Sequence, residues 1–597
     1  MCGILSITGN EKNTTNTELL QRLQRLEYRG YDSFGLGSFN SNTGQAHVEK
    51  HIGKVSDYLK TTYEETTLRS AVAHTRWATH GAVTVENTHP HVSYDGNVML
   101  VHNGVIENYQ KIKQFLICKN VPFVSDTDTE VISNLLAYTF NQVTNLKQMD
   151  RVEGLQTCIR QLQGSYAISF IHKDDPSTIC YAKKGSPLVL GREEDNSKFY
   201  VSSDIYTFID KTNQVQYLSD GDYGYLSPGI CVKYNLKDQV KVNCSWTTIT
   251  ASYDQVELGD HQHYMIKEIC EQRNVIQNTV RNQPRCSVDK LTNKIKTARR
   301  VIFSACGSSY YSSMVGANLL RSQGLLCECV LSSEFDSHSN TLTAKDVIIC
   351  VSQSGETADI IESINIANNK KCTVIGVVNV PNSSIDRLAD YTVYVNAGPE
   401  LCVLSTKSFT SQVALFMLVY QQLSGREIYF DALESNIYEL VAKSTRDTIR
   451  YVAEKLYNKE HIYVLGRGEQ YPVALEAALK IKEVSYIHAE GFAGGELKHG
   501  SIALIEQDTP CILLVTKQHE LELLANGAEL KSRGAIIIGV SHEPNELFDH
   551  YIRVNECDMS GPLLQIIPIQ LLAYNLALLK NLDPDKPRNL AKSVTVK

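Results

Sequence analysis

Residues 347–357 of the chain, VIICVSQSGET, join an unbroken apolar run to a turn rich in hydroxyl groups. A short, continuous apolar run bounded by turn residues predicts a strand that is buried on both faces. The Ser, Gly and Thr residues that follow are typical of the start of a helix. A buried strand that leads through a polar turn into a helix is the repeating unit of a parallel sheet. This stretch therefore predicts an α/β fold around it.

The same unit recurs on both sides of this stretch. Further apolar runs predict strands at 301–305, 374–378, 461–465, 511–515 and 536–540. The pattern is broken once, before residue 461, so we expect two sequential α/β domains with parallel sheets. In open sheets of this type ligands bind at the carboxyl ends of the strands. The polar turns after the strands are therefore the candidate sites.

The first part of the chain, to about residue 235, has a different pattern. Short strands are expected at 71–74, 98–101 and 166–171, and helices near 18–26 and 129–140. This mixture predicts an α+β layered domain. The polar, weakly periodic stretch from 237 to 262 is expected to be a linker.

Composition limits the function classes. The chain has 597 residues, 58 basic and 66 acidic side chains, and no basic block, which argues against nucleic acid as a partner. No uninterrupted apolar run reaches the roughly 18 residues of a membrane span, and no leader peptide is expected. Sixteen cysteines without CxxC pairs indicate reduced thiols and a cytoplasmic location. His74, His80, His89 and His91 lack the ligand spacing of a metal site, so we expect no metal.

Cys2 is the first candidate catalytic residue. Removal of Met1 would leave a cysteine whose own α-amino group, with a reference pKa of about 7.7–8.0, lies beside its thiol. Such a terminal nucleophile needs no separate histidine as base. Taken alone, a cysteine at this position is more often an ordinary small residue.

Two successive polar turns indicate a phosphorylated ligand. The turn from Ser352 to Thr357 offers hydroxyls, a glycine and the backbone N–H groups of a helix start. Ser308 and Ser309 occupy the matching turn after the preceding strand. A single turn of this kind is more often a helix cap without a ligand, but two together favour a phosphate. No lysine follows at Walker spacing, so a nucleoside triphosphate is not indicated.

Three charged residues share one face of a helix expected at 472–487. Glu476, Lys480 and Glu483 are spaced by four and three residues. Such a row is usually a solvated ion-paired face, but the apolar residues around it favour a buried catalytic row. His499, between glycines, is a candidate acid/base for opening a sugar ring, or a plain loop histidine. Lys592, in an apolar C-terminal tail, is a candidate Schiff-base lysine, although tails usually fray.

Asn103 and Gly104 offer a side-chain amide and a backbone N–H side by side, as in an oxyanion hole. The same dipeptide also forms simple hairpin turns. Arg76 and Asp128 are complementary in charge to the carboxylate and ammonium groups of a free amino acid.

Together these motifs resemble the glutamine–fructose-6-phosphate aminotransferase (isomerizing) family, the glucosamine-6-phosphate synthases, over essentially the whole chain. The resemblance rests on six segments: Cys-Gly-Ile at 2–4, YRGYDS at 28–33, HTRWATHG at 74–81, SQSGET at 352–357, the stretch 490–500 and the tail around Lys592.

For the first domain the resemblance implies a glutaminase. Cys2 would attack the glutamine carboxamide with its own α-amine as base, and Asn103 and Gly104 would stabilise the oxyanion. Arg29 would support the Cys2 end, and Trp77 would gate an ammonia channel. The residues implied to bind glutamine are Arg76, Thr79, His80 and Asp128.

For the later domains the resemblance implies synthesis of glucosamine 6-phosphate. His499 would assist ring opening, Lys592 would form an imine with the open ketose, and Glu483 would move a proton between C1 and C2. Glu476 and Lys480 would complete that row. The residues implied to bind fructose 6-phosphate are Ser308, Ser309, Ser352, Gln353, Ser354, Thr357, Val403 and Ala591.

The resemblance also implies the architecture. We expect an N-terminal-nucleophile domain with α/β/β/α layers, followed by two α/β sugar-isomerase (SIS) domains. The expected boundaries are 2–235 for the glutaminase, 236–262 for the linker, 263–445 and 446–587 for the SIS domains, and 588–597 for a catalytic tail. The family implies no cofactor, small-molecule substrates and a homodimer.

This chain departs from the family's pattern at a few positions. Ser308 stands where Thr is usual, Ser501 replaces a usual Pro after His499-Gly500, and Phe34 replaces a small residue. The long insertion of animal enzymes is absent, which puts feedback by a nucleotide sugar in doubt.

Two other functions are weighed against this one. An amidophosphoribosyltransferase would share the glutaminase half but needs a phosphoribosyl-pyrophosphate loop, which we do not find. A non-enzymatic sugar-phosphate sensor predicts loss of Cys2, Glu483, His499 or Lys592, yet all four are present.

Overall fold

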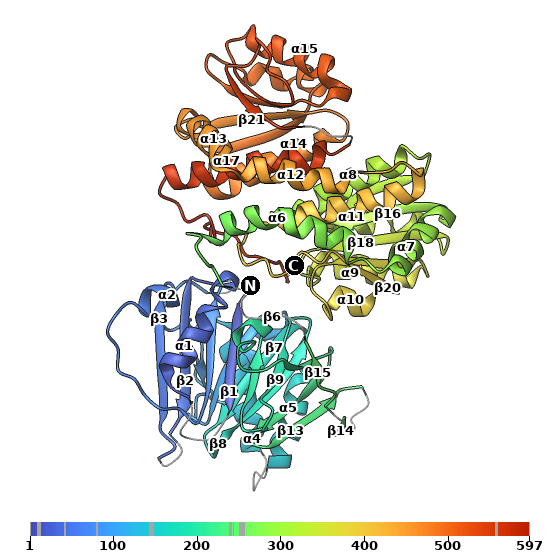
Figure 1. Cartoon of the computed structure of the whole chain (residues 1–597). Coiled ribbons are helices and arrows are strands. Elements are labelled where there is room, and N and C mark those ends of the chain that lie inside the picture. The colour runs from blue at the N-terminus through green and yellow to red at the C-terminus, as the bar shows by residue number, and fades with distance from the viewer. Residues whose placement is uncertain are drawn as a thin grey trace. The chain divides into compact units, whose positions relative to one another are not determined.

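The computed structural model describes the chain except residues 1, 9–13, 41–42, 79–80, 143–147, 238–240, 243, 250–256, 556–558 and 596–597. The chain divides into two compact units. Unit 1 contains residues 1–257 and returns at 591–597, and unit 2 contains residues 258–590. Figure 1 shows the elements of both units in the order of the chain.

Unit 1 contains two antiparallel sheets. The first has the order β15-β11-β9-β10-β1-β4-β2-β3 and the second the order β14-β13-β12-β8-β7-β6-β5. The strands of the first sheet are β1 (Gly3–Thr8), β2 (Ser33–Phe39), β3 (Ala46–Ile52), β4 (Ser70–Arg76), β9 (Val189–Arg192), β10 (Phe199–Ser202), β11 (Gln214–Tyr217) and β15 (Thr247–Thr248). Those of the second are β5 (His91–Val92), β6 (Val98–Ile106), β7 (Gly164–His172), β8 (Asp175–Lys184), β12 (Asp222–Ser227), β13 (Ile230–Asn235) and β14 (Lys241–Val242).

The two sheets pack face to face because each buries an apolar face. Ile4 and Val72 of the first sheet and Val101 and Ile171 of the second belong to one buried cluster. The other face of the second sheet packs against α3 (Tyr109–Ile117), α4 (Asp128–Asn141) and α5 (Gln148–Ile159). Helix α1 (Asn16–Gln24) contacts β1 and β4, and the short α2 (Val55–Tyr58) follows β3. The predicted α/β/β/α layers are therefore confirmed (Figure 1).

The strands predicted at 71–74, 98–101 and 166–171 form β4, β6 and β7, which are each longer than their apolar runs. The extensions carry polar residues such as Thr75 and Arg76 at the strand ends, where pairing continues beyond the apolar core. Strands β14 and β15 lie within the stretch 236–262 that we expected to be a linker, and each extends one sheet.

Unit 2 contains two parallel sheets of the same order. The first is β17-β16-β18-β19-β20 and the second β22-β21-β23-β24-β25. The strands of the first are β16 (Arg300–Ala305), β17 (Cys327–Leu331), β18 (Asp346–Ser352), β19 (Thr373–Val378) and β20 (Tyr391–Tyr394). Those of the second are β21 (His461–Gly466), β22 (His488–Ala493), β23 (Pro510–Leu514), β24 (Ile536–Ser541) and β25 (His550–Arg553). The two predicted α/β domains are confirmed.

Helices flank and join the two sheets of unit 2 (Figure 1). One hydrophobic cluster contains strand residues of both sheets, for example Val301 and Val464, together with the helices between them. The helices of this unit are α6 (Tyr264–Arg281), α7 (Arg285–Thr297), α8 (Gly307–Arg321), α9 (Ala358–Asn369), α10 (Ser384–Leu388), α11 (Lys407–Ser424), α12 (Phe430–Val441), α13 (Lys443–Leu456), α14 (Gln470–Ser485), α15 (Glu520–Lys531), α16 (Gly561–Leu564) and α17 (Ile566–Leu579).

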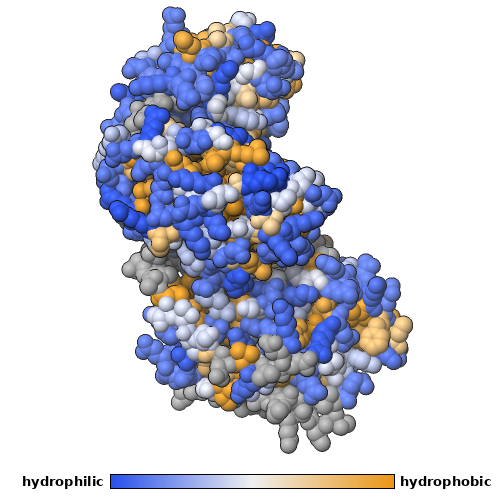
Figure 2. All heavy atoms as spheres, turned by 90° about the vertical axis from the view of Figure 1, so that its right-hand side faces the viewer, coloured by the Kyte–Doolittle hydropathy of each residue, from blue (hydrophilic) through white to orange (hydrophobic). Residues whose placement is uncertain are grey.

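The most apolar helical stretch of the described chain is Gly561–Leu579. By length and hydropathy it is the one described helix that would suffice to cross a membrane, and 83% of its most apolar window is buried inside the protein. Its place in the shared core of unit 2 accounts for its sequence. The face in Figure 2 is dominated by hydrophilic residues, with apolar side chains in scattered groups.

Candidate active site

Cys2 lies immediately before β1. Strand β4 pairs with β1, and its last residues lie beside this end of β1. Its Sγ accepts a hydrogen bond from the backbone N–H of Trp77 at 3.2 Å and lies 3.4 Å from the carbonyl oxygen of the same residue. Burial raises the pKa of the Cys2 thiol, and the positive charge of Arg76 acts against that rise. Because the thiolate is the nucleophile, a thiol in this environment needs a base close by.

The Asn103 side chain connects Cys2 to a neighbouring strand end. Its Nδ2 donates to the carbonyl oxygen of Cys2 and to Oγ of Ser203, both at 2.8 Å. The same Ser203 hydroxyl accepts the backbone N–H of Ile4 at 2.8 Å. Both N–H groups of the Asn103 amide are therefore engaged in this arrangement. Donation to an oxyanion requires the amide to exchange one of these bonds.

His74 holds the other end of the Asn103 amide. Its Nε2 lies 3.0 Å from Oδ1 of Asn103 and 3.1 Å from the carbonyl oxygen of His102. Both neighbours are acceptors, so Nε2 carries the hydrogen. Burial lowers the pKa of His74 to about 3, which keeps the ring neutral. The His89 ring stacks on that of His74, and the His91 ring packs edge-on against His89 in the same buried group.

Gly104 occupies a position that no other residue fits. Its φ is +134°, and a Cβ atom there would lie 2.1 Å from the carbonyl oxygen of Ser165 on the neighbouring strand β7. Gly104 lines the same cavity as Cys2 and Asn103, and its close approach to β7 excludes a side chain at this position.

The predicted glutamine-binding charges are buried in the same unit. The Arg76 guanidinium donates to the carbonyl oxygens of Gly81 at 3.0 Å and Ala82 at 3.1 Å. Asp128 begins helix α4 and accepts the backbone N–H of Ile106 at 2.9 Å. Both side chains contribute to the electrostatic environment of Cys2. Thr79 and His80, predicted to bind the same substrate, lie outside the described residues.

Arg29, predicted to support the Cys2 end, contacts the segment that follows β10. It pairs with Asp204 at 2.9 Å, and the Tyr28 hydroxyl donates to the same carboxylate at 2.6 Å. Asp204 directly follows Ser203, so this ion pair fixes the serine that holds Asn103. Trp77 packs edge-on against Tyr31, with ring centroids 5.6 Å apart.

A cavity of about 100 Å³ adjoins Cys2. Cys2, Asn103 and Gly104 line it together with Ala591 and Ser593 of the C-terminal tail, which belongs to unit 1. Lys592 and Ala591 belong to the same unit as Cys2, whereas the other residues predicted to bind the sugar phosphate belong to unit 2.

Ser203 was missed by the sequence interpretation. The only signal is the run Ser202-Ser203-Asp204 at the end of a strand, and such runs are common at strand ends. Its partner Asn103 is a hundred residues earlier in the chain, and only the strand pairing brings the two together.

The Ser203→Ala variant tests the Asn103 network. Two buried donors would lose their acceptor, so we expect a loss of about 1–3 kcal/mol in unfolding free energy and a lower kcat for glutamine hydrolysis with KM little changed. Because both residues act through one amide, the double variant with Asn103→Ala should lose no more activity than Asn103→Ala alone. Steady-state glutamate release measures kcat and KM of the single and double variants, and denaturant unfolding measures their stability. Additive losses of activity in the double variant would contradict a shared role.

In unit 2 the charged row of α14 meets the start of α8. Lys480 Nζ lies 3.3 Å from a Glu476 oxygen, 2.7 Å from a Glu483 oxygen and 3.1 Å from the Ser308 hydroxyl. The Ser308 hydroxyl also donates to Glu476 at 2.9 Å. Glu476 and Lys480 are fully buried, so this row is not the solvated face that was the alternative. Ser309 accepts from Gln412 of α11 at 3.0 Å.

Burial raises the pKa of Glu476 to about 7, although Lys480 opposes that rise. The unfolded carboxyl would have its ordinary pKa of about 4.3, so the unfolded state binds fewer protons between these values. The unfolding free energy is therefore expected to fall as pH rises from about 4.3 to about 7 and then to level off, by up to about 4 kcal/mol. Comparison with Glu476→Gln by denaturant unfolding across this range isolates the effect. A difference that does not change with pH would contradict the shift.

The turn after β18 has the form of a phosphate cradle. The Ser352 hydroxyl accepts the backbone N–H of Gly355 at 3.0 Å and lies 3.1 Å from the Thr357 hydroxyl. Oγ of Ser354 accepts the backbone N–H of Glu356 at 3.2 Å, and Gln353 follows β18 directly. The predicted hydroxyls are thus grouped at the carboxyl end of a central strand, immediately before α9.

Gly355→Ala tests this turn. Gly355 has a φ of +68°, and a Cβ atom there would lie 2.0 Å from the Ser383 hydroxyl. We expect a cost of about 1–3 kcal/mol in stability and weaker binding of fructose 6-phosphate, since the cradle must shift. Gly398→Ala, also at positive φ but with nothing near its Cβ position, is the matched control. Unchanged calorimetric binding in Gly355→Ala would show that the turn does not hold the ligand.

Two further residues that were predicted to belong to the sugar site, Val403 and His499, lie elsewhere in unit 2. The buried Val403 donates its N–H to the carbonyl oxygen of Asp585 at 3.0 Å. His499 ends the short 3₁₀ segment Glu496–His499 and is exposed, and Gly500 after it has a φ of +145°.

Comparisons with known protein families agree with this division. The Glutamine amidotransferase domain family matches residues 74–210, and the SIS domain family matches residues 294–421 and again 455–580. Both matches lie on the units that carry the geometry described above.

Curated relatives match over the entire chain. The proteins named glutamine--fructose-6-phosphate aminotransferase [isomerizing] from Chlorobaculum tepidum, Aquifex aeolicus and Geobacillus kaustophilus are 36%, 37% and 38% identical, with 100% of each chain covered. Among solved structures, the C-terminal domain of glucosamine-fructose-6-phosphate aminotransferase from Francisella tularensis is 31% identical. It matches 55% of this chain and all of its own, with a TM-score of 0.51.

Proposed function

Because the chain belongs to the glutamine–fructose-6-phosphate aminotransferase (isomerizing) family of enzymes, we propose that it converts L-glutamine and D-fructose 6-phosphate to L-glutamate and D-glucosamine 6-phosphate. The observation that carries the proposal is the similarity over the full length of the chain, which includes the glutaminase unit and both SIS domains. This reaction would supply amino sugars for hexosamine synthesis.

In the glutaminase half, Cys2 attacks the glutamine carboxamide once removal of Met1 has freed its α-amino group. That amine takes the thiol proton and later returns one to the departing ammonia. Arg76 and Asp128, which are complementary in charge to the α-carboxylate and the α-ammonium group of glutamine, bind these groups. Thr79 and His80 assist. Asn103 and the backbone of Gly104 stabilise the oxyanion after the amide exchanges its bond to the Cys2 carbonyl oxygen.

In the sugar half, the phosphate of fructose 6-phosphate binds the turn from Ser352 to Thr357, and Ser308 and Ser309 line the site. His499 assists ring opening, and Lys592 forms an imine with the open ketose. Ammonia that is channelled from Cys2 past Trp77 displaces the lysine. Glu483 then moves a proton from C1 to C2, with Lys480 and Glu476 fixing its position and charge.

The proposal is tested with amide-¹⁵N-glutamine and fructose 6-phosphate, with mass spectrometry of the products. Label in glucosamine 6-phosphate, and not only in free ammonium, is expected when unlabelled ammonium is present in excess, because transfer is internal. Glutamate formation without a labelled amino sugar would mean that the acceptor is a different compound. Loss of label to the excess ammonium would contradict channelling.

Trapping with borohydride tests the role of Lys592. Reduction of the imine would attach the sugar covalently, so peptide mapping is expected to find one added hexose phosphate on Lys592. Lys592→Arg should abolish the adduct and keep glutamine hydrolysis. An adduct that persists in this variant would assign the imine to another lysine.

We also propose a homodimer in which the exposed His499 serves the partner's sugar site. Mixed dimers of His499→Ala and Glu483→Gln chains should then regain activity that neither variant has alone. An absence of regain in verified mixed dimers would place both residues in one subunit's site.

A further inference from the structure

The two SIS domains of unit 2 are repeats whose equivalent positions follow from the strand pairing. Phe303 pairs with Ile349 in the first sheet as Val464 pairs with Ile512 in the second. The same number of residues separates the start of β16 from Gly307 as separates the start of β21 from Gly468. Those two glycines have φ values of +55° and +57°. This agreement in backbone conformation supports the equivalence.

The equivalence assigns a counterpart to each element of the candidate sugar site. Counted from the strand starts, Glu469 and Gln470 correspond to Ser308 and Ser309. Through the pairing of the next strand, Thr516 and Lys517 correspond to Gln353 and Ser354. The second domain thus has its own helix start and its own strand-end turn at the switch point between β21 and β23, where open sheets bind ligands.

The counterparts of the catalytic row lie on α8 of the first domain and at its C-cap. Glu476, Lys480 and Glu483 correspond to Val315, Leu319 and Ser322. All three of these residues, and the four counterparts above, line one cavity of about 470 Å³. This size is in the usual range for small-molecule sites. The cavity is therefore the pseudo-symmetric mate of the candidate sugar site, and none of the residues in the row positions can transfer a proton.

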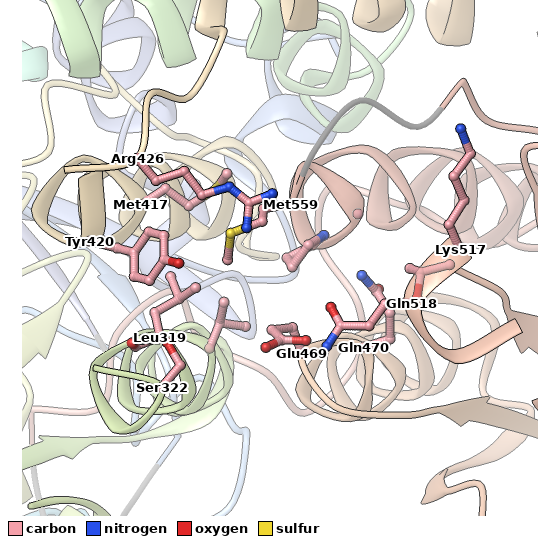
Figure 3. A pocket seen from close by; sticks show the side chains of 14 residues that line it. Leu319, Ser322, Met417, Tyr420, Arg426, Glu469, Gln470, Lys517, Gln518 and Met559 are labelled. Atoms are coloured by element: carbon pink, nitrogen blue, oxygen red, sulfur yellow. Dashed lines mark hydrogen bonds between the residues drawn. The ribbon is translucent and has the colours of Figure 1, made fainter. Parts of the chain in front are cut away.

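The cavity contains a polar group without a partner. Gln470 is 2% exposed, and among the described residues its Oε1 has no hydrogen-bond partner. Figure 3 shows its amide turned into the space between α8 and α14, beside Glu469. Because an unpartnered buried amide costs free energy, this side chain is suited to a ligand with hydroxyl groups.

The charges around the cavity favour an anion. Arg426, just after α11, lies across the cavity from Gln470, and Lys517 rises from the loop after β23 (Figure 3). Glu469 is the opposing charge. The N-terminus of α14, a helix of sixteen residues, adds the positive end of its dipole, while its first two N–H groups donate to the carbonyl oxygens of Arg467 and Gly468.

We propose that this cavity is a second, non-catalytic site for a hexose phosphate. The phosphate lies near the start of α14 and Lys517, and the sugar hydroxyls reach Gln470 and Ser322. The sugar part of this assignment rests on the proposed function of the first-domain site. No bond is made or broken, because Val315 and Leu319 occupy the positions of the acid/base groups.

Titration calorimetry of the full chain with fructose 6-phosphate, without glutamine, tests the proposal. Two equivalents per chain are expected. Lys517→Glu and Gln470→Leu should each lower the affinity of one bound equivalent about tenfold or more and leave the affinity of the other unchanged. Lys455→Glu, the same charge change on an exposed lysine of α13, should leave both. The retained equivalent shows that the variants are folded.

A first-site variant separates the two claims. In Ser354→Glu the added carboxylate should repel phosphate from the first site and leave only the equivalent that Lys517→Glu removes. A single equivalent that is lost in Ser354→Glu and unaffected by both cavity variants would overturn the second site and leave the proposed function standing. A single equivalent that is lost in the cavity variants and retained in Ser354→Glu would support the second site and contradict the proposed first site.

Two further probes test the ligand class. Fructose alone should not bind the cavity, because the phosphate supplies the charge. Inorganic phosphate should bind it more weakly than fructose 6-phosphate. Equal binding of inorganic phosphate would overturn the assignment to a sugar phosphate.

Discussion

Cys2→Ala is expected to abolish glutamine-dependent formation of glucosamine 6-phosphate, by roughly 10⁴-fold or more, while synthesis from added ammonium continues. The nucleophile is lost, and no other described thiol lines the cavity beside Asn103 and Gly104. The sugar-side residues of unit 2 are unchanged, so ammonia supplied from solution can still be used.

Both activities are measured on the same preparation by chromatography of the amino sugar. Cys118→Ala is the matched control, because Cys118 is exposed at the end of α3 and far from Cys2 in the chain. Loss of the ammonium-dependent reaction in Cys2→Ala would show that Cys2 has a second role in the sugar half. Retention of the glutamine-dependent reaction would remove Cys2 as nucleophile.

Lys480→Met is expected to destabilise unit 2 by about 3–5 kcal/mol and to abolish the sugar reaction. Lys480 is completely buried and pairs with both Glu476 and Glu483. Burial raises the pKa of Glu476, and the positive charge of Lys480 opposes that rise. Removing one partner of a buried ion pair leaves the other charge without compensation. Glutamine hydrolysis, which depends on unit 1, should continue.

The control is Lys482→Met, two residues further along α14 on an exposed position. The double variant Glu476→Gln with Lys480→Met should regain part of the lost stability, because it leaves fewer unpaired charges, but no activity. Denaturant unfolding measures stability. An unaltered midpoint in Lys480→Met would contradict the uncompensated charge, and a double variant less stable than Lys480→Met would do the same.

Much of the fold was predictable because its signals are local. The apolar runs that became β16, β18 and β21 are buried on both faces, so they are continuous in sequence. The spacing of Glu476, Lys480 and Glu483 placed them on one helical face, and the apolar residues beside them indicated burial. Such features depend only on residues within one or two turns or one strand.

The connections between distant segments were not predictable from local patterns. Ser203 meets Asn103 through strand pairing, and a serine at a strand end carries no mark of its partner. The counterparts of the catalytic row, Val315 and Leu319, look like ordinary core residues of a helix. Their significance follows only from the register of the two parallel sheets. The resemblance to a family supplied the substrates, which no spacing could have named.

The return of residues 591–595 to the unit that begins with β1 has a consequence for synthesis on the ribosome. The wall of the Cys2 cavity that contains Ala591 and Ser593 is translated last. At roughly 5–20 residues per second, the segment between residue 257 and this wall takes on the order of tens of seconds to make. During that interval the nascent chain already contains Cys2, Asn103 and Gly104, while the cavity beside them is open on the side that the tail later covers.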